Sequence, residues 1–84
     1  MAVSTPLRKF ECLLRLGERD RARRFGEQQA GDAASAARLA RAALVRQAPE
    51  LAAHFAALAL QKDPNDALAK AVRAQLEQAV AGGP

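Results

Sequence analysis

Residues that favour β-strands are almost missing from this chain. Only four valines and Thr5 are branched at the β-carbon, and isoleucine, tryptophan and tyrosine are absent. Alanine and leucine, the strongest helix formers, occupy 22 and 11 of the 84 positions. Because strands are built mainly from β-branched and aromatic side chains, the sequence predicts an all-α fold.

The first predicted helix covers residues 6–16. Thr5 and Pro6 suit its start, because threonine caps helices and proline is favoured at the first helical position. Gly17 suits its end, where a residue in the left-handed conformation is common. Five apolar residues at helical spacing would form one face of this helix: Leu7, Phe10, Leu13, Leu14 and Leu16.

The next stretch, residues 18–31, is polar and rich in arginine. Asp20 is a candidate cap for a helix over residues 21–29, although Gly26 would weaken that helix. We expect Phe10, Phe25 and Phe55 to belong to the core. The alternative is that one of them anchors a partner helix, and Phe25 is the candidate because its neighbours are too polar to bury it within this chain.

Three further helices are predicted, each with a start signal and an apolar face. They cover residues 33–47, 49–62 and 67–81. The start signals are Asp32 as a cap, Pro49 at a first helical position, and either Asn65 or Asp66 as a cap. Short turns between helices produce antiparallel neighbours, so these three should run up, down and up.

We expect a single domain over residues 1–84, because a chain of this length supports one small core. Residues 1–31 would be an arginine-rich helical segment, and residues 32–81 an alanine-rich hairpin with a closing helix. The predicted architecture is a small antiparallel bundle of four to five helices. Alanine buries little area, so such a core requires very close packing or the surface of a partner. Homodimerisation or a permanent partner is therefore expected.

One segment has the length and small-residue pattern of a known helical repeat. Ala33 to Asp66 spans 34 residues, with Leu39 on the first helix and Ala52 and Ala59 on the second. The segment ends in the turn Asp63-Pro64-Asn65-Asp66. In this frame it resembles one tetratricopeptide repeat. The resemblance covers residues 33–80, although alanine stands at the family's aromatic positions. It implies a scaffold that receives a peptide or helix in a concave groove.

Positive charge is concentrated in the first part of the chain. Residues 1–46 contain ten basic and five acidic side chains, whereas residues 47–84 contain three and four. The densest cluster is Arg15, Arg19, Arg21, Arg23 and Arg24. Three readings stay open: a surface for an acidic protein, a phosphate-backbone surface, or a solvated face paired with nearby carboxylates. Arginine and alanine are also favoured in the proteins of GC-rich genomes.

Nothing in the sequence indicates catalysis, a metal ion or a cofactor. His54 is the only histidine, and Glu50 at helical spacing would pair with it on the surface. Cys12 is the only cysteine, so it forms no internal disulfide, and no Cys/His cluster has the spacing of a metal site. We expect the protein not to be an enzyme.

Targeting and membrane signals are equally weak. Arg8 and Lys9 interrupt the first apolar residues, and the run from Leu51 to Leu60 is too short to span a bilayer. A soluble cytoplasmic protein without a membrane partner is the expectation.

These patterns favour a non-enzymatic protein–protein interaction module, an adaptor or a chaperone-like protein. An apolar face would accept an amphipathic helix of an acidic partner. The alternative is a small basic regulator that binds DNA or RNA. The expected contact residues are Leu7, Phe10, Leu13, Leu14, Arg15, Arg19, Arg23 and Phe25. A chain without residues 1–31 should fold as a hairpin and lose binding.

Overall fold

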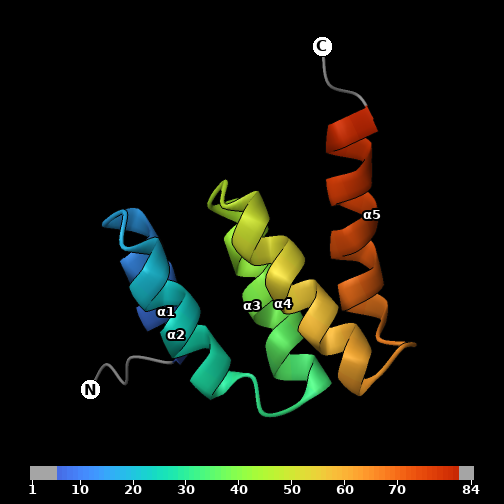
Figure 1. The fold of residues 1–84 in the computed structure, drawn as a ribbon, viewed down its shortest axis with the longest axis horizontal. Helices are drawn as coiled ribbons and strands as arrows, with labels where there is room; N and C mark the ends of the chain where they lie inside the picture. Colours follow the sequence, from blue (N-terminus) through green and yellow to red (C-terminus); the bar gives the residue numbers. More distant parts are fainter. Residues whose placement is uncertain (1–5, 82–84) are drawn as a thin grey trace.

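The computed structural model describes residues 6–81, and the side chains of residues 6–78. These residues form five helices and no strand (Figure 1): α1 (Pro6–Arg15), α2 (Arg19–Gln29), α3 (Ala33–Val45), α4 (Pro49–Lys62) and α5 (Ala67–Ala81). The prediction of a small all-α bundle is therefore confirmed. The predicted cap at Thr5 lies outside the described residues.

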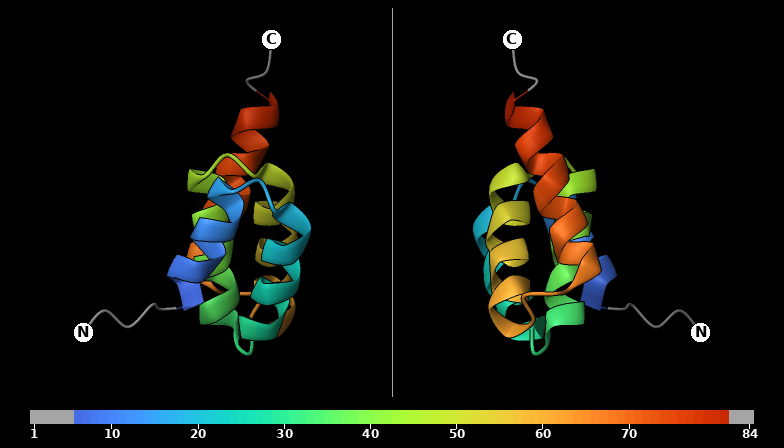
Figure 2. Two further views of the ribbon diagram at one scale, coloured as in Figure 1. Left: turned by 90° about the vertical axis from the view of Figure 1, so that its left-hand side faces the viewer. Right: turned by 90° about the vertical axis from the view of Figure 1, so that its right-hand side faces the viewer.

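Two antiparallel hairpins stand side by side, α1 with α2 and α3 with α4 (Figure 1). The fifth helix, α5, packs against both α3 and α4, so the last three helices run up, down and up as predicted. Figure 2 shows α1 and α3 in one layer and α2 and α4 in the other. The first helices of the two hairpins are thus parallel neighbours.

The turns that close the two hairpins are the same structure, thirty residues apart. Gly17 and Gln47 both adopt positive φ, at 79° and 61°. In the first turn, the amides of Gly17 and Glu18 donate to the carbonyls of Leu14 and Leu13. In the second, the amides of Gln47 and Ala48 donate to those of Leu44 and Ala43. This pair of bonds is the Schellman motif, which satisfies the last free carbonyls of a helix.

The helix starts agree with the sequence only in part. The Asp32 side chain accepts the Ser35 amide at 2.7 Å, and Asp66 accepts the Ala69 amide at 2.9 Å, so both predicted caps are present. The second helix begins two residues before its predicted start, because Glu18 follows the first turn directly and its carbonyl accepts the first helical bond. Asp20 is therefore inside the first turn rather than a cap.

The Phe55 ring joins the two hairpins, through contacts with Phe10 and with the backbone of α2. Phe10 of α1 and Phe55 of α4 are fully buried and meet edge to face, with centroids 5.5 Å apart. The backbone of α2 passes against the Phe55 ring at Gly26, where a Cβ would lie 3.0 Å from Cε1 and closer still to Cζ. The glycine that weakens α2 as an isolated helix thus allows its close approach to α4.

Alanine supplies most of the remaining core, chiefly between α3 and α4. Both helices bury alanines at successive turns, which lets their backbones approach closely: Ala36, Ala40, Ala43, Ala52, Ala56 and Ala59. The predicted apolar faces of these helices are confirmed, with Leu39, Leu51 and Phe55 buried. On α1 the prediction fails at Leu16, which is 69% exposed because the helix has already ended at Arg15.

A candidate protein-binding groove between α1 and α3

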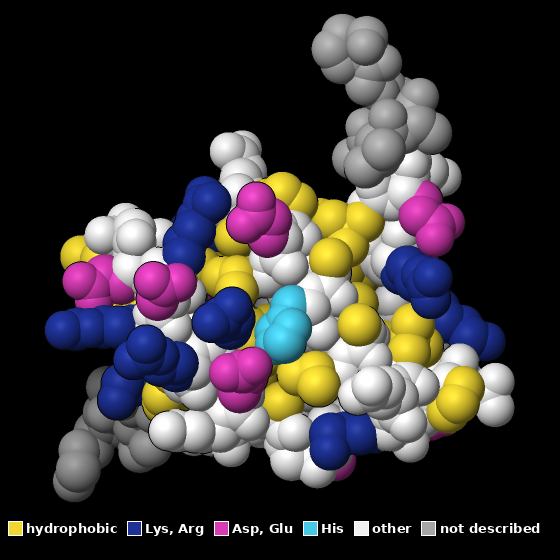
Figure 3. All heavy atoms as spheres, viewed as in Figure 1, with side chains coloured by type: hydrophobic (Ala, Val, Ile, Leu, Met, Phe, Trp, Pro, Cys, Tyr) yellow, Lys and Arg dark blue, Asp and Glu magenta, His cyan; other side chains and the backbone are white. Residues whose placement is uncertain are grey.

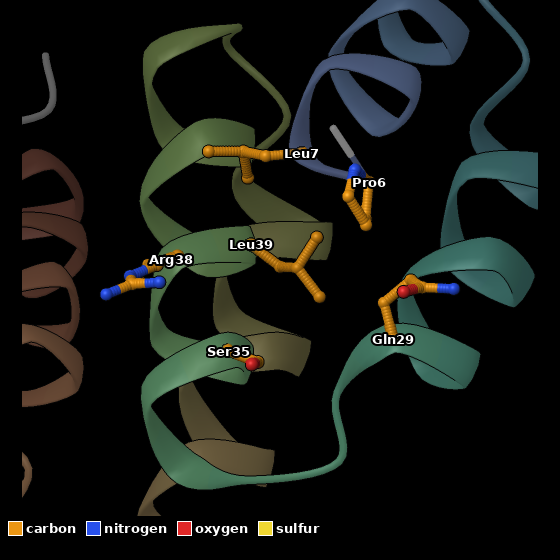
Figure 4. Close-up of a pocket in the computed structure, with 6 residues that line it drawn as sticks. All are labelled: Pro6, Leu7, Gln29, Ser35, Arg38 and Leu39. Carbon is orange, nitrogen blue, oxygen red and sulfur yellow. The ribbon is translucent and has the colours of Figure 1, made fainter. Parts of the chain in front are cut away.

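Three hollows have lining residues both from α1 and from α3 or its C-terminal cap. The first, the N-terminal hollow, has a volume of about 330 Å³ and is lined by Pro6, Leu7, Gln29, Ser35, Arg38 and Leu39. In Figure 4, Leu39 points into the space below the start of α1, while Arg38 extends away from it toward α5. Proline and two leucines make this end of the boundary largely apolar.

The second, the basic hollow, has a volume of about 700 Å³. Four cationic side chains, one carboxylate and the thiol surround it: Arg8, Lys9, Arg15, Arg46, Glu11 and Cys12. The carboxylate is engaged, since Nη2 of Arg46, the residue that caps the C-terminus of α3, lies 3.3 Å from Glu11 Oε2 of α1. This ion pair joins α1 to the C-terminal end of α3, and the lining residues of the hollow carry a net positive charge.

The third, the C-terminal hollow, has a volume of about 320 Å³ and lies where α1 and α3 end. Leu14, Arg15, Val45, Arg46 and Gln47 line it, so it shares two arginines with the basic hollow. Val45 is 67% exposed, which makes it one of two large apolar side chains exposed among the described residues; Leu16 is the other. The α1–α3 groove, meaning these three hollows together, therefore combines a largely apolar N-terminal hollow with two hollows that arginine side chains line.

The predicted contact residues divide between three places. Leu7, Leu14 and Arg15 line the α1–α3 groove. Leu13 and Phe25 are half-buried against the core. Phe10 is fully buried against Phe55, so its prediction as a contact residue is wrong, because it holds the two hairpins together instead.

Phe25 is better covered than its polar sequence neighbours indicate. Its ring packs against the core on one side, and the Lys9 Nζ lies 4.9 Å from the ring centroid. Since a cation over a ring face is attracted to the π-electrons, Lys9 and Phe25 join α1 to α2. The predicted core position is therefore confirmed for Phe10 and Phe55, and Phe25 is half-buried rather than uncovered.

The remaining predicted arginines lie away from the groove. Because α1 ends at Arg15 and α2 begins at Arg19, Arg15 does not share a helix with Arg19 and Arg23. Arg19 and Arg23 of α2 instead line a smaller hollow against α4, of about 160 Å³, with His54. Figure 3 shows this face, where acidic and basic side chains alternate over the first hairpin. The α2–α4 face is thus a mixed, solvated surface.

His54 has a different partner from the one expected. Its Nε2 lies 3.0 Å from Glu27 Oε2 of α2, and Glu50 on its own helix is not its partner. Both side chains are more than a third exposed, so the pair contributes little to stability. The pair is an interhelical contact between α2 and α4.

One carboxyl group has a shifted pKa. The backbone amide and side chain of Ser35 donate to Asp32 and hold the pKa of this carboxyl below its ordinary value, with smaller contributions from Arg38 and Lys62. The group is the N-cap of α3, so its charge serves the helix terminus. In the part of the chain that the structure describes, no three His, Cys, Asp or Glu residues gather as a metal site would require.

Comparison with protein-family models, curated proteins and solved structures finds no match to this chain. None of the described helices is long and apolar enough to cross a membrane.

The sequence did not reveal the contribution of α3 to this groove. Leu39, Val45 and Arg46 line it, and none was among the expected contact residues. Val45 stands outside the predicted apolar face of its helix, and its place could be interpreted only once α1 and α3 were known to be parallel neighbours.

Proposed function

We propose that this protein is a non-enzymatic interaction module that binds a helix or peptide of an acidic partner protein in the α1–α3 groove. The observation that carries the proposal is the largely apolar N-terminal hollow between α1 and α3, with the exposed Val45 and several cationic side chains on the same two hairpin helices and their ends. Helix-in-groove recognition uses this combination of apolar anchors and charged rims. An adaptor or a chaperone for a partner subunit would both act in this way.

The repeated hairpin turn supports the tetratricopeptide-like interpretation within this proposal. Two hairpins with identical closing bonds, followed by α5, stack their first helices side by side. Helical-repeat scaffolds build binding surfaces from such stacking. A cytoplasmic location is part of the proposal.

Nucleic acid is the second candidate, which the basic hollow favours. Single-stranded nucleic acids are bound largely by stacking on exposed aromatic rings. The chain has three phenylalanines and neither tyrosine nor tryptophan. Phe10 and Phe55 are fully buried, and Phe25 lies beneath Lys9. The protein partner is therefore preferred.

A peptide selection tests the proposal. Random peptides displayed on phage would be selected against the full chain, and the best synthetic peptides titrated by fluorescence anisotropy. Val45→Glu places a charge in the groove at an exposed position, and Ala53→Glu places the same charge at an exposed position of α4. We expect Val45→Glu to weaken binding at least tenfold and Ala53→Glu to leave it unchanged.

Two results would contradict the proposal. One is a selection that yields no peptide whose binding responds to Val45→Glu. The other is tighter binding of a mixed-sequence DNA or RNA oligonucleotide, with an affinity that falls log-linearly as salt rises. That second result would establish the nucleic-acid alternative.

A further inference from the structure

The walls of the N-terminal hollow are more apolar than those of the other three hollows described above. Leu39 and Leu7 form two of its walls, and the exposed Pro6 stands at its edge. Each of the other three hollows is lined by at least two arginines, whereas this one has a single arginine. Its volume of about 330 Å³ exceeds the roughly 150 Å³ of an apolar cavity that admits a benzene ring. One aromatic or branched aliphatic side chain would therefore fit.

The single charged side chain that lines this hollow is Arg38. Its guanidinium extends across α3 toward α5, while Leu39 points to the other side of the helix (Figure 4). Asp32 is engaged in capping α3, because its side chain accepts the Ser35 amide at 2.7 Å. Arg38 is exposed, so a carboxylate from another molecule can reach it, and arginine binds carboxylates with two parallel bonds.

The helices on both sides of the hollow are also cationic. Together α1 and α3 contain five cationic side chains and one carboxylate, Glu11, which is paired with Arg46. A segment that lies over the hollow therefore meets a positive surface. Acidic residues beside its apolar anchor would be attracted to that surface, and lysine or arginine at the same positions would be repelled.

A second copy of this chain offers no such anchor in the part that the structure describes. Leu16 and Val45 are its exposed large apolar side chains, and an arginine is the direct chain neighbour of each. On α1, Leu7 and Leu14 pack against the core, and Glu11 already has its partner. The occupant is therefore a segment of a different protein.

We infer that the N-terminal hollow is the anchor site for one large apolar side chain of an acidic partner segment, and that Arg38 pairs with a carboxylate beside that anchor. The inference rests on the proposed function and specifies which side chains the partner supplies. Because Leu39 and Arg38 point to opposite sides of α3 (Figure 4), the anchor and the carboxylate are separated by about the width of a helix, 10 Å. That is about three residues of extended chain.

Three peptides of about nine residues test this inference. The first has a central phenylalanine, with glutamate three residues before and after it and serine elsewhere. The second replaces the phenylalanine by alanine, and the third replaces both glutamates by lysine. In a titration followed by amide resonances of the ¹⁵N-labelled protein, the first should bind at least fivefold more tightly than either control. The largest shifts should occur at Leu7, Gln29, Ser35 and Leu39.

Two matched pairs of variants locate the site in the protein. Gln29→Trp would place a ring in the hollow, whereas Gln28→Trp makes the same change at an exposed neighbour that does not line it. Arg38→Glu reverses the charge at the rim, and Arg41→Glu does so one turn further along α3, outside the lining. Gln29→Trp should weaken binding of the first peptide at least tenfold. Arg38→Glu should weaken it and strengthen binding of the lysine peptide, while both controls change each affinity less than twofold.

The outcomes separate this inference from the proposed function. Equal affinities for the phenylalanine and alanine peptides, or equal effects of Gln29→Trp and Gln28→Trp, would overturn the anchor site. Equal affinities for the glutamate and lysine peptides would overturn the pairing with Arg38. A dimer in sedimentation that Gln29→Trp dissociates would also overturn the inference, because the occupant would then be a second copy.

The phage-selected peptides supply the remaining distinction. If they lost affinity in Val45→Glu but not in Gln29→Trp, the interaction module would stand with a different anchor site. If they responded to neither substitution, both the module and the anchor site would be wrong. Circular dichroism of every variant would verify that its helices are kept.

Discussion

Replacing Gly26 by alanine should destabilise this protein, although alanine is the better helix former. Gly26 lies within α2, and its backbone faces the Phe55 ring. A Cβ at this position would stand 3.0 and 3.1 Å from Cε1 and Cε2, and closer to Cζ than real Cβ atoms ever approach a neighbour. The ring is fully buried and meets Phe10 at its edge, so it has little room to retreat.

Two opposing free energies set the magnitude. Alanine in place of glycine inside a helix gains about 1 kcal/mol of helix propensity. Overpacking a filled core costs typically 1–3 kcal/mol, and contact with three ring atoms at once places this case at about 3 kcal/mol. The net loss of unfolding free energy is therefore about 2 kcal/mol. In a domain of this size that corresponds to a melting temperature lower by roughly 8–16 °C.

Thermal unfolding followed by circular dichroism measures this effect, with Gly31→Ala as the matched control. A Cβ at Gly31 meets nothing within 4 Å, so that variant should stay within about 0.5 kcal/mol of the parent protein. Phe55→Leu supplies the second control, because a smaller side chain makes room for the new methyl group. The loss of unfolding free energy in the double variant should be smaller than the two single losses added together, by about 1 kcal/mol or more.

A melting temperature of Gly26→Ala equal to or above that of Gly31→Ala would contradict this prediction. Such a result would mean that helix propensity outweighs the contact and that the hairpins are not held at this distance. Additive effects of Gly26→Ala and Phe55→Leu would also count against it, since the two residues would then not touch.

Two smaller predictions concern the helix ends. Gln47→Gly should raise the free energy of unfolding by up to about 1 kcal/mol, because the left-handed backbone at Gln47 costs a residue with a side chain about 1–2 kcal/mol. Gly17→Ala at the matching turn should lower it by about as much. A fall in the stability of Gln47→Gly in urea unfolding would contradict the equivalence of the two turns. The lowered pKa of Asp32 means that its charge stabilises the fold above the unfolded-state value, near pH 4, and that this contribution disappears as the pH falls through the folded-state pKa. The stability difference between the parent protein and Asp32→Asn should therefore change below about pH 4 and stay constant above it, and a difference independent of pH would contradict the assignment.

The sequence predicts local features of this fold well and long-range ones poorly. Helix propensity, the Asp32 cap and the left-handed Gly17 depend on residues within one or two turns, so a single sequence displays them. The partners of His54 and Arg46 lie 27 and 35 residues away in the chain, and no local pattern identifies them. For the same reason, Leu7 and Leu14 could be recognised as an apolar face, but not as the wall of a groove completed by α3.

Long-range packing also changes what the removal of residues 1–31 can show. Phe55 is covered by Phe10 and Gly26, and both belong to the removed segment. Deletion would expose a ring whose burial contributes about 1.5–3 kcal/mol, a large share of the stability of a small domain. Lost binding could then reflect an unfolded hairpin, and new binding could reflect the uncovered ring.

The inner and outer faces of α1 must therefore be tested separately. Phe10 points inward and holds the hairpins together, whereas Cys12 and Arg15 lie in the basic hollow on the outer side. Substitutions at Arg15 or Val45 change the groove without touching the Phe10–Phe55 contact. A variant such as Phe10→Ala should instead lower stability by about 3–5 kcal/mol and abolish binding only by unfolding the protein. Binding lost in Arg15→Glu at an unchanged melting temperature would thus locate the partner on the outer face of α1.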